Sequence, residues 1–451
     1  MFVKTTEDAA VAVGHSVEPA GLRVLFDQVM VRIAGRFGRV EPRRTAGRML
    51  AGLLSGLERK TCWQLAEHAG MRDPVAMQRL LRTAVWDADA VRDDVRDLVV
   101  EHLGSPHAVL VVDETGFVKK GTWSVGVQRQ YSGTAGRIEN AQVAVFLGYA
   151  APAGHALIDR RLYLPDSWCQ DAARTARADV PEQVRFATKP SLALQMLTNA
   201  LGAGVPAGFV AADTVYGNDP VFRAGVRDLG LGYVLAVSCA HRITVPGGIR
   251  RRVDQVAGDL PPESWQRYSA GTGSKGPRWY DWAWIDATTE AGPGHSLLIR
   301  SNTTTGELAY YRVYTPGRVS LADLVRVAGT RWCVEESFQA AKGQVGLDQY
   351  QVRGWTGWHR FITLAMLALA YLAISAAHHA PNARPGTHEL ARTDEPVPLT
   401  VPESRRLFAA FLSPAHRDPE HTLHWSTWRR THQGHARHAH YKRRMTSTNS
   451  P

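Results

Sequence analysis

Two short, uninterrupted apolar runs, each followed by an aspartate, constrain the fold of this chain most. Residues 107–112 read His-Ala-Val-Leu-Val-Val and precede Asp113, and residues 208–212 read Gly-Phe-Val-Ala-Ala and precede Asp213. A continuous apolar run of this length is typical of a strand that is buried on both faces of a sheet. If the two strands are neighbours, both carboxylates lie at one edge of the sheet, where they could share Mg²⁺ or Mn²⁺.

Each aspartate also has a purely structural interpretation, because aspartates at strand ends commonly cap turns. Asp219 is a local competitor for the role of Asp213. However, Asp219 directly precedes Pro220, and this pair is typical of a helix N-cap followed by a first-position proline. The pattern therefore favours Asp213 as the chemical group and Asp219 as the cap.

The elements around these runs predict an α/β fold with a mixed sheet flanked by helices. Three adjacent strands are followed by a helix, a strand, a helix and a further strand, an order that is typical of α/β proteins. In addition to the two apolar runs, the expected strands cover residues 142–149, 156–164 and 233–237, and the expected helices cover residues 189–201 and 219–229. We assign this α/β core to residues 105–237 and 319–378.

Residues 1–104 are expected to form a separate helical domain. Their apolar residues recur at spacings of three and four, and two short helices over 61–70 and 75–85 resemble a helix-turn-helix. We expect this domain to bind DNA, although the nearly balanced charge of the segment leaves a structural role open. The arginines that could contact phosphates are Arg43, Arg44, Arg48, Arg79 and Arg82.

The amino-acid composition changes again in the rest of the chain. Residues 238–318 are rich in Gly, Pro and Trp and contain strand-like runs, which predicts a β-rich insertion. Residues 361–377 carry no charge, which favours a buried core helix over a membrane span. Residues 379–451 are expected to form a Pro-rich loop and a weakly ordered, basic, His-rich tail that either solubilises the chain or contacts nucleic acid.

Composition narrows the partners and excludes some classes of protein. Lys and Arg number 53 against 42 Asp and Glu, a net charge of +11, which favours a polyanionic partner, nucleic acid before membrane. The four cysteines are widely spaced without a Cys-x-x-Cys pair, which argues against a zinc ribbon or a disulfide scaffold. The N-terminus does not resemble a secretion signal, so a cytoplasmic location is expected. No phosphate-binding loop with its lysine is present, so no nucleotide cofactor is expected.

A third acidic residue comes from the expected helix over residues 320–343. At 100° per residue, Arg331 lies about 40° and Lys342 about 20° from Glu335, on opposite sides of it. Relative to Glu336, the same two bases are displaced by roughly 140° and 120°. One face therefore carries Glu335 between two bases. Surface ion pairs would explain this pattern as well, but the flanking Trp332, Val334 and Phe338 indicate burial, and buried charges need partners or a metal.

These motifs resemble a known family. The spacing Arg-x-x-x-Glu-x-x-x-x-x-x-Lys over 331–342 is similar to the signature around the last acidic residue of DDE transposases of the insertion-sequence type. The segments 111–121 with 124–140, and 211–217, are similar to the two aspartate blocks of the insertion-sequence 701 family. The resemblance covers the chain from about residue 20 onward. The related pattern often has Tyr three residues before the Arg, where this chain has Ala328, so no role is inferred for that Tyr.

The resemblance implies an RNase H-like catalytic core and a metal-dependent reaction on DNA. Asp113, Asp213 and Glu335 would be the catalytic residues and would hold two Mg²⁺ ions, with Mn²⁺ able to substitute. Hydrolysis at the transposon ends would free 3′-OH groups, which then attack target DNA in strand transfer. Arg331 and Lys342 would hold phosphates. Lys119, Lys120, Arg129 and Arg137 would contact the DNA backbone, or else form a solvated hairpin face.

The implied protein is a bacterial, cytoplasmic, nucleoid-associated transposase that acts on DNA as a homodimer, without a membrane partner. Two alternatives remain open from the sequence. One is a DNA-binding protein that no longer cuts, and the other is a metal-dependent nuclease without strand transfer.

Overall fold

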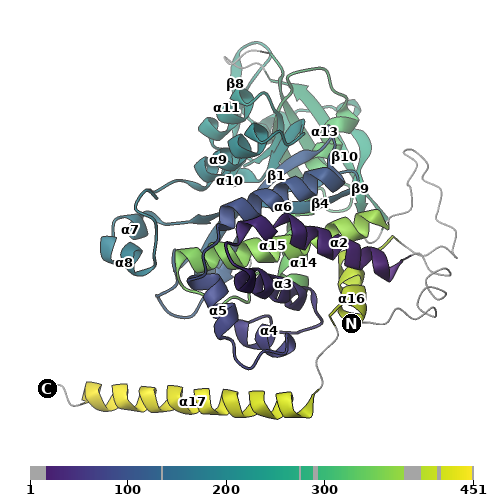
Figure 1. Cartoon of the computed structure of the whole chain (residues 1–451). Helices are drawn as coiled ribbons and strands as arrows, with labels where there is room; N and C mark the ends of the chain where they lie inside the picture. The colour runs from purple at the N-terminus through teal and green to yellow at the C-terminus, as the bar shows by residue number, and fades with distance from the viewer. Residues whose placement is uncertain are drawn as a thin grey trace.

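The computed structural model describes residues 17–133, 136–273, 276–287, 293–379, 398–413 and 418–448. Its main feature is a large mixed sheet flanked by helices (Figure 1), as the element pattern predicts. Within the described residues the sheet has ten strands. Nine follow the order β2-β3-β1-β5-β6-β12-β11-β10-β9, and β4 pairs with β3 outside this path. The predicted residues 109–112, 209–212 and 233–237 all lie in strands of this sheet.

The first half of the sheet contains both antiparallel and parallel pairs. Strand β1 is antiparallel to β3, and β3 is antiparallel to β2 and β4. On its other side β1 is parallel to β5, which is parallel to β6. These strands are β1 (Val109–Val118), β2 (Gln128–Ser132), β3 (Arg137–Ala151), β4 (Gly154–Tyr163), β5 (Phe209–Ala212) and β6 (Gly232–Val237). Three helices lead into β5: α7 (Asp166–Cys169), α8 (Ala172–Arg177) and α9 (Lys189–Gly202). Two more lie between β5 and β6: α10 (Thr214–Gly217) and α11 (Pro220–Asp228).

Strand β1 is longer than its apolar run predicts. It continues through Asp113 to Val118, because β3 pairs with it along its full length. Its parallel pairing with β5 stops at Val112, whose partner is Ala212. Asp113 therefore lies within a strand, at the point where that strand loses one of its two neighbours.

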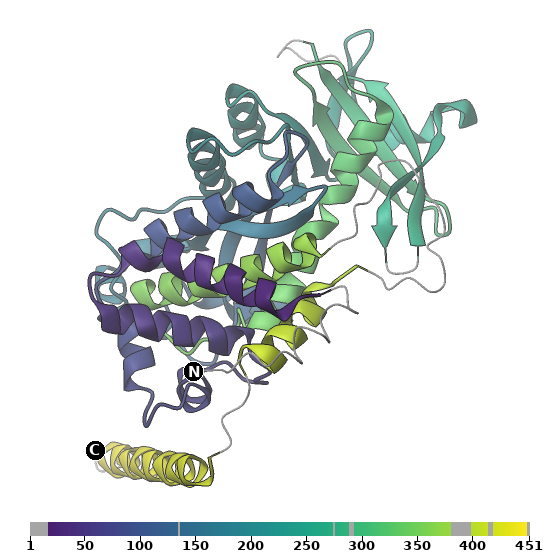
Figure 2. The same cartoon turned by 45° about the vertical axis from the view of Figure 1, so that its right-hand side comes forward.

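The segment 238–318 is rich in strands, as expected, but most of them extend the central sheet. Strand β12 pairs with β6, and β11, β10 and β9 follow outward in antiparallel order. Figure 2 shows these strands at the end of the molecule away from the N-terminal helices. A small second core lies here, formed by residues such as Ile243, Val253 and Leu297. The elements are β7 (Arg242–Val245), β8 (Ile249–Arg252), α12 (Val253–Gly258), η2 (Pro262–Ser264), β9 (Gln266–Gly273), β10 (Gly276–Asp286), β11 (His295–Asn302) and β12 (Leu308–Tyr314).

One long apolar helix connects the N-terminal helices to the sheet. Helix α15 (Trp355–His378) packs against α2, α3, α5, α6 and β4. It is long and apolar enough to cross a membrane, yet 83% of its most apolar window is buried inside the protein. The uncharged segment is therefore the core helix that the sequence favours. The N-terminal elements are α2 (Pro19–Arg32), η1 (Ala34–Arg36), α3 (Val40–Leu54), α4 (Cys62–His68), α5 (Val75–Arg82) and α6 (Ala88–Leu103).

The expected helix over 320–343 is divided in two. Helix α13 (Leu321–Thr330) begins at a capping box formed by Ser320 and Asp323, and α14 (Trp332–Val345) ends at Gly346, which has φ 69°. Arg331 stands between the two helices. Helix α14 contacts β1, β3 and β4, so it packs against the sheet.

The expectation of a weakly ordered tail is wrong for the described part of it. Residues Val401–Phe411 form α16, and Pro419–Thr448 form the long helix α17. Phe408 and Trp425 are fully buried, and the indole of Trp425 donates a hydrogen bond to the Met71 carbonyl, 2.7 Å away. Contacts with distant residues order this segment, and its composition alone does not reveal them. The expected Pro-rich loop falls largely on residues 380–397, outside the described residues.

Candidate active site

Asp113 and Asp213 come directly after two residues that pair with each other in neighbouring parallel strands. The register pairs Val112 with Ala212, so the aspartates are the next residues along β1 and β5. Asp213 is also the N-cap of the short helix α10 (Thr214–Gly217), where its carboxylate accepts a hydrogen bond from the Val215 amide, 2.9 Å away. Asp219 caps α11 through the Phe222 amide. The capping role assigned to Asp219 is therefore confirmed, and Asp213 caps a helix as well.

The backbone around Asp213 is fixed by a close approach of α10 to the sheet. A Cβ atom on Gly217 would lie 1.8 Å from the Ala236 carbonyl oxygen of β6. Only glycine allows this contact, because a Cβ atom here would clash with the backbone of β6, which cannot move aside. The turn that carries Asp213 is therefore seated directly on β6.

The two aspartates lie in an environment that disfavours their charged forms. Burial, followed by the charge of Asp213, raises the pKa of Asp113 to about 7. Burial and the charge of Glu114 raise the pKa of Asp213. Desolvation and like charges both act in this direction, whereas a nearby cation acts against them. The site therefore has unbalanced negative charge that a cation would relieve.

Arg331 lies between the first and the third predicted carboxylate. Its guanidinium nitrogens are 3.9 Å from Asp113 Oδ2 and 3.1 Å from Glu335 Oε1. Burial raises the pKa of Glu335 in spite of this arginine. The i,i+4 pair expected from helical geometry is present, although Arg331 stands just before the helix.

Glu336 faces a different part of the molecule. Its Oε2 lies 3.4 Å from His155 Nε2 in β4, and the hydrogen bond to His155 lowers the pKa of Glu336. The separation of Glu335 from Glu336 thus follows the angular argument made from the sequence. Lys342, on the Glu335 side, donates to the Thr115 hydroxyl of β1, 2.7 Å away.

The donor set suits a hard divalent cation, but the three carboxylates are not drawn together. Asp113, Asp213 and Glu335 offer only oxygen ligands, as Mg²⁺ and Mn²⁺ prefer. Across the described residues, the one group of three metal-ligating side chains with ligand atoms within 4.8 Å is His155, Cys333 and Glu336 instead. Arg331 occupies the space between Asp113 and Glu335, so its guanidinium would have to move for all three carboxylates to converge.

The predicted DNA-contacting residues fall into two groups. Lys120, Arg129 and Arg137 are exposed on and beside the β2–β3 hairpin, and Arg137 pairs with Glu139 at 2.8 Å. Lys119 is half-buried, with its ammonium 3.4 Å from the centre of the Tyr350 ring, and burial lowers its pKa to about 8. Lys119 and Lys342 therefore contact the protein itself, whereas the other three face solvent.

The predicted short helices of the N-terminal region are present as α4 and α5. An open cleft beside them is lined by Arg44 and Arg48 of α3 and by Arg72 and Asp73 of the α4–α5 turn. Arginine thus gathers on this face, next to acidic neighbours.

Sequence reasoning missed the partners of Glu114. This residue accepts hydrogen bonds from Lys189 Nζ and from the Tyr216 hydroxyl, each at 2.6 Å. It joins β1 to α9 and α10, and its charge contributes to the raised pKa of Asp213. The acidic pair Asp113-Glu114 was visible in the sequence, but Lys189 and Tyr216 are far away along the chain.

The family follows from comparison with known proteins. The family model described as "DDE superfamily endonuclease" matches residues 32–284. The chain belongs to this superfamily. Asp113 and Asp213 lie within the matched residues, and Glu335 lies beyond them. The resemblance to the insertion-sequence 701 family is also confirmed. A probable transposase for insertion sequence element IS701 from Microchaete diplosiphon is 28% identical over 200 residues, which are 43% of this chain and 48% of the relative.

The match to this relative therefore spans about half of its length. Among solved structures, this chain is similar to a piggyBac transposase determined by cryo-EM in a synaptic complex with hairpin DNA. That likeness has a TM-score of 0.40 at 12% identity and covers 87% of this chain and 80% of the other.

Proposed function

We propose that this chain is a DNA transposase that cleaves phosphodiester bonds at transposon ends and joins the freed 3′-OH groups to target DNA. The observation that carries the proposal is the register that sets Asp113 beside Asp213, with Arg331 linking Asp113 to Glu335. The superfamily and the IS701 relative support the same reaction class.

The catalytic core in this proposal is RNase H-like and comprises residues 105–237 and 319–378. The strand order supports this assignment, since an antiparallel set β4-β3-β1 continues into the parallel strands β5 and β6. The residues 1–104 would form the DNA-binding domain, 238–318 the β-rich insertion, and 379–451 the C-terminal extension.

We assign the metal-binding role to Asp113, Asp213 and Glu335, which would together hold two divalent ions. When bound, two Mg²⁺ ions, for which Mn²⁺ could substitute, would activate the attacking oxygen and stabilise the leaving oxygen. The protein's own contribution is positional. Strand β1 and the α10 cap hold the two aspartates side by side, and the first turn of α14 presents Glu335.

DNA contact is assigned to the basic residues around this site. The exposed Lys120, Arg129 and Arg137 would neutralise backbone phosphates. Once Arg331 has left the carboxylates, its planar guanidinium suits a phosphate near the scissile bond. Lys119 contacts Tyr350 and Lys342 contacts Thr115, and both lysines would contact the same DNA from these less exposed positions. Synapsis of two ends implies a homodimer on DNA, in the bacterial cytoplasm at the nucleoid.

The test uses purified protein, DNA carrying the element's own ends, a target plasmid and Mg²⁺ or Mn²⁺, with EDTA as a control. The proposal predicts cleavage at the ends and joined products in the wild type, both lost in Glu335→Gln. Asp219→Asn is the matched control, because asparagine also caps a helix. Cleavage without joining would replace the proposal by a nuclease. DNA binding without cleavage under either metal would replace it by a silent DNA-binding protein.

A further inference from the structure

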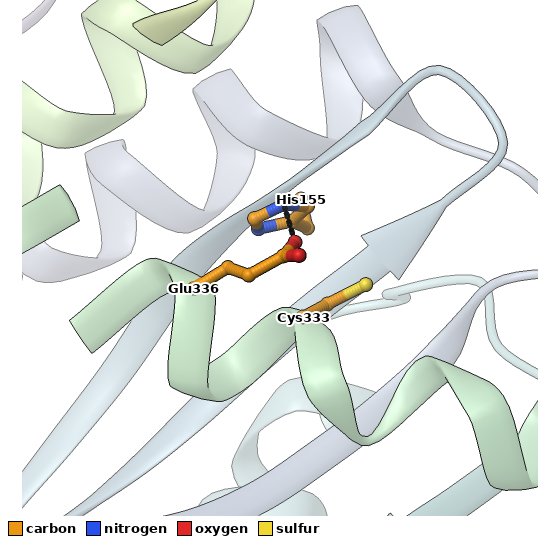
Figure 3. Close-up of side chains that lie close together, drawn as sticks. All are labelled: His155, Cys333 and Glu336. Atoms are coloured by element: carbon orange, nitrogen blue, oxygen red, sulfur yellow. Dashed lines mark ion pairs between the residues drawn. The ribbon is translucent and has the colours of Figure 1, made fainter. Parts of the chain in front are cut away.

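Three side chains of different chemistry converge on the side of α14 that faces away from Arg331. Figure 3 shows Cys333 and Glu336 side by side on α14, with the Glu336 carboxylate reaching toward His155 near the start of β4. One ligand atom from each residue lies within 4.8 Å of the other two. Cys333 and Glu336 are three residues apart, so they share a helix face. His155 reaches them from the start of β4.

The imidazole of His155 is held by a second contact. Its Nδ1 lies 2.8 Å from the hydroxyl of Ser337, a buried residue, and its Nε2 faces Glu336 at 3.4 Å. Metal-binding histidines usually have one ring nitrogen fixed by a neighbouring group, which orients the other toward the ion. Ser337 supplies this arrangement for His155.

We propose that His155, Cys333 and Glu336 bind a Zn²⁺ ion, with water as the fourth ligand. One imidazole nitrogen, one thiolate and one carboxylate match the ligands of tetrahedral zinc, whereas Mg²⁺ prefers oxygen alone. The thiolate and the carboxylate together balance the charge of Zn²⁺. This site is distinct from the three carboxylates of the proposed active site and does not depend on their role.

Binding is coupled to loss of a proton. Zinc binds the thiolate form of cysteine, so Cys333 must lose its proton when the ion binds. The Cys333 S–H bond breaks as the sulfur–zinc bond forms, and the proton passes to solvent. Arg278 also acts electrostatically on Cys333 and Glu336, and its guanidinium donates to the Ala270 carbonyl at 3.1 Å. Since the two anionic ligands neutralise the ion, Arg278 meets no net positive charge.

The consequence of this site is mechanical. The ion would tie the first turn of α14 to the β3–β4 hairpin, and Glu335 lies on that same turn. Zinc would therefore fix the rotation of the helix that carries Glu335, from the side opposite Arg331.

The test is a Co²⁺ titration of the purified, metal-free full chain under reducing conditions. Thiolate ligation gives a charge-transfer band in the near ultraviolet, and tetrahedral geometry gives intense visible bands. The proposal predicts both, saturating at one equivalent and abolished by equimolar Zn²⁺. Cys333→Ser should lose the charge-transfer band, and Cys239→Ser, at an exposed free cysteine, should keep it. Ser337→Ala should weaken binding about 10- to 100-fold.

The titration also separates this site from the proposed active site. Asp113→Asn should leave the cobalt spectrum unchanged, whether or not the chain cleaves DNA. Thermal unfolding provides a check on folding, because Zn²⁺ should raise the Tm of the wild type and of Cys239→Ser but not of Cys333→Ser. A missing charge-transfer band, or one that survives in Cys333→Ser, would overturn the proposal.

Discussion

At the scale of single residues, the most unusual group is Asp113. It is a largely buried carboxyl with Asp213 and Glu114 as neighbours, and Arg331 is too distant at 3.9 Å to neutralise it fully. A group of this kind is costly in a protein that has no use for it, and perturbed carboxyls of this kind gather at functional sites. The environment of Asp113 is therefore better explained by a cation that binds there than by a contribution of Asp113 to the stability of the fold.

This environment predicts how stability depends on pH in metal-free protein. The ordinary pKa of Asp113 is 3.8 and its folded value is about 7, so between these limits the folded state binds more protons than the unfolded state. The free energy of unfolding should therefore fall as pH rises from about 4 to about 7, by at most about 4 kcal/mol from this group. Asp113→Asn should flatten the decline. Urea denaturation in EDTA at several pH values measures this, and equal slopes in the two proteins would refute the explanation.

Residue chemistry could be predicted from the sequence where it depends on local periodicity. The two apolar runs predicted that Asp113 lies beside Asp213, although Asp113 stands within β1 and not at its end. The 100° rotation per residue distinguished Glu335 from Glu336. Contacts between distant segments could not be predicted in this way. The pairing of Glu114 with Lys189 and Tyr216, and the convergence of His155 on Cys333, depend on how β1, β4, α9 and α14 pack.

At the scale of elements, two helices differ from the sequence expectation for identifiable reasons. The helix over 320–343 is interrupted at Arg331, which directs the guanidinium toward both Asp113 and Glu335. The basic tail forms α17 because a few aromatic residues anchor it. Trp428 meets Trp63 of α4 edge-on at 4.9 Å, and Trp425 is buried beside them. A mostly polar helix has too little apolar periodicity for the sequence to reveal such docking.

Trp425 is therefore expected to hold α17 on the N-terminal helices. Trp425→Ala should remove a buried side chain that contributes on the order of 3–5 kcal/mol where packing is complete. The result should be faster proteolysis within residues 418–448, while the rest of the chain stays resistant. Leu423→Ala, an exposed position on the same helix, is the control. Unchanged proteolysis of Trp425→Ala would mean that α17 is held by other contacts.

At the scale of the whole molecule, one hydrophobic core runs from the N-terminal helices through α15 into the sheet. The sequence predicted the order of the helical N-terminal region, the α/β region and the strand-rich segment, because their compositions and apolar periodicities differ. It did not predict that they share a core, or that β9–β12 continue the central sheet, because strand pairing between distant segments leaves no local pattern. Helix α15 thus links the N-terminal helices to the sheet that carries the candidate site. If the N-terminal helices bind DNA, that DNA is held by the same packed core as the candidate site.

The central claim is that Asp113, Asp213 and Glu335 form a divalent-metal site. The most direct measurement is Mn²⁺ binding at about pH 8, where Asp113 is ionised, followed by electron paramagnetic resonance in a Cys333→Ser background that removes the proposed zinc ligand. Asp213→Asn and Asp219→Asn are compared, because both replace a helix-capping aspartate with another capping residue. The account predicts that Asp213→Asn weakens Mn²⁺ binding at least tenfold and that Asp219→Asn binds like the parent. Equal binding by the two variants would contradict it.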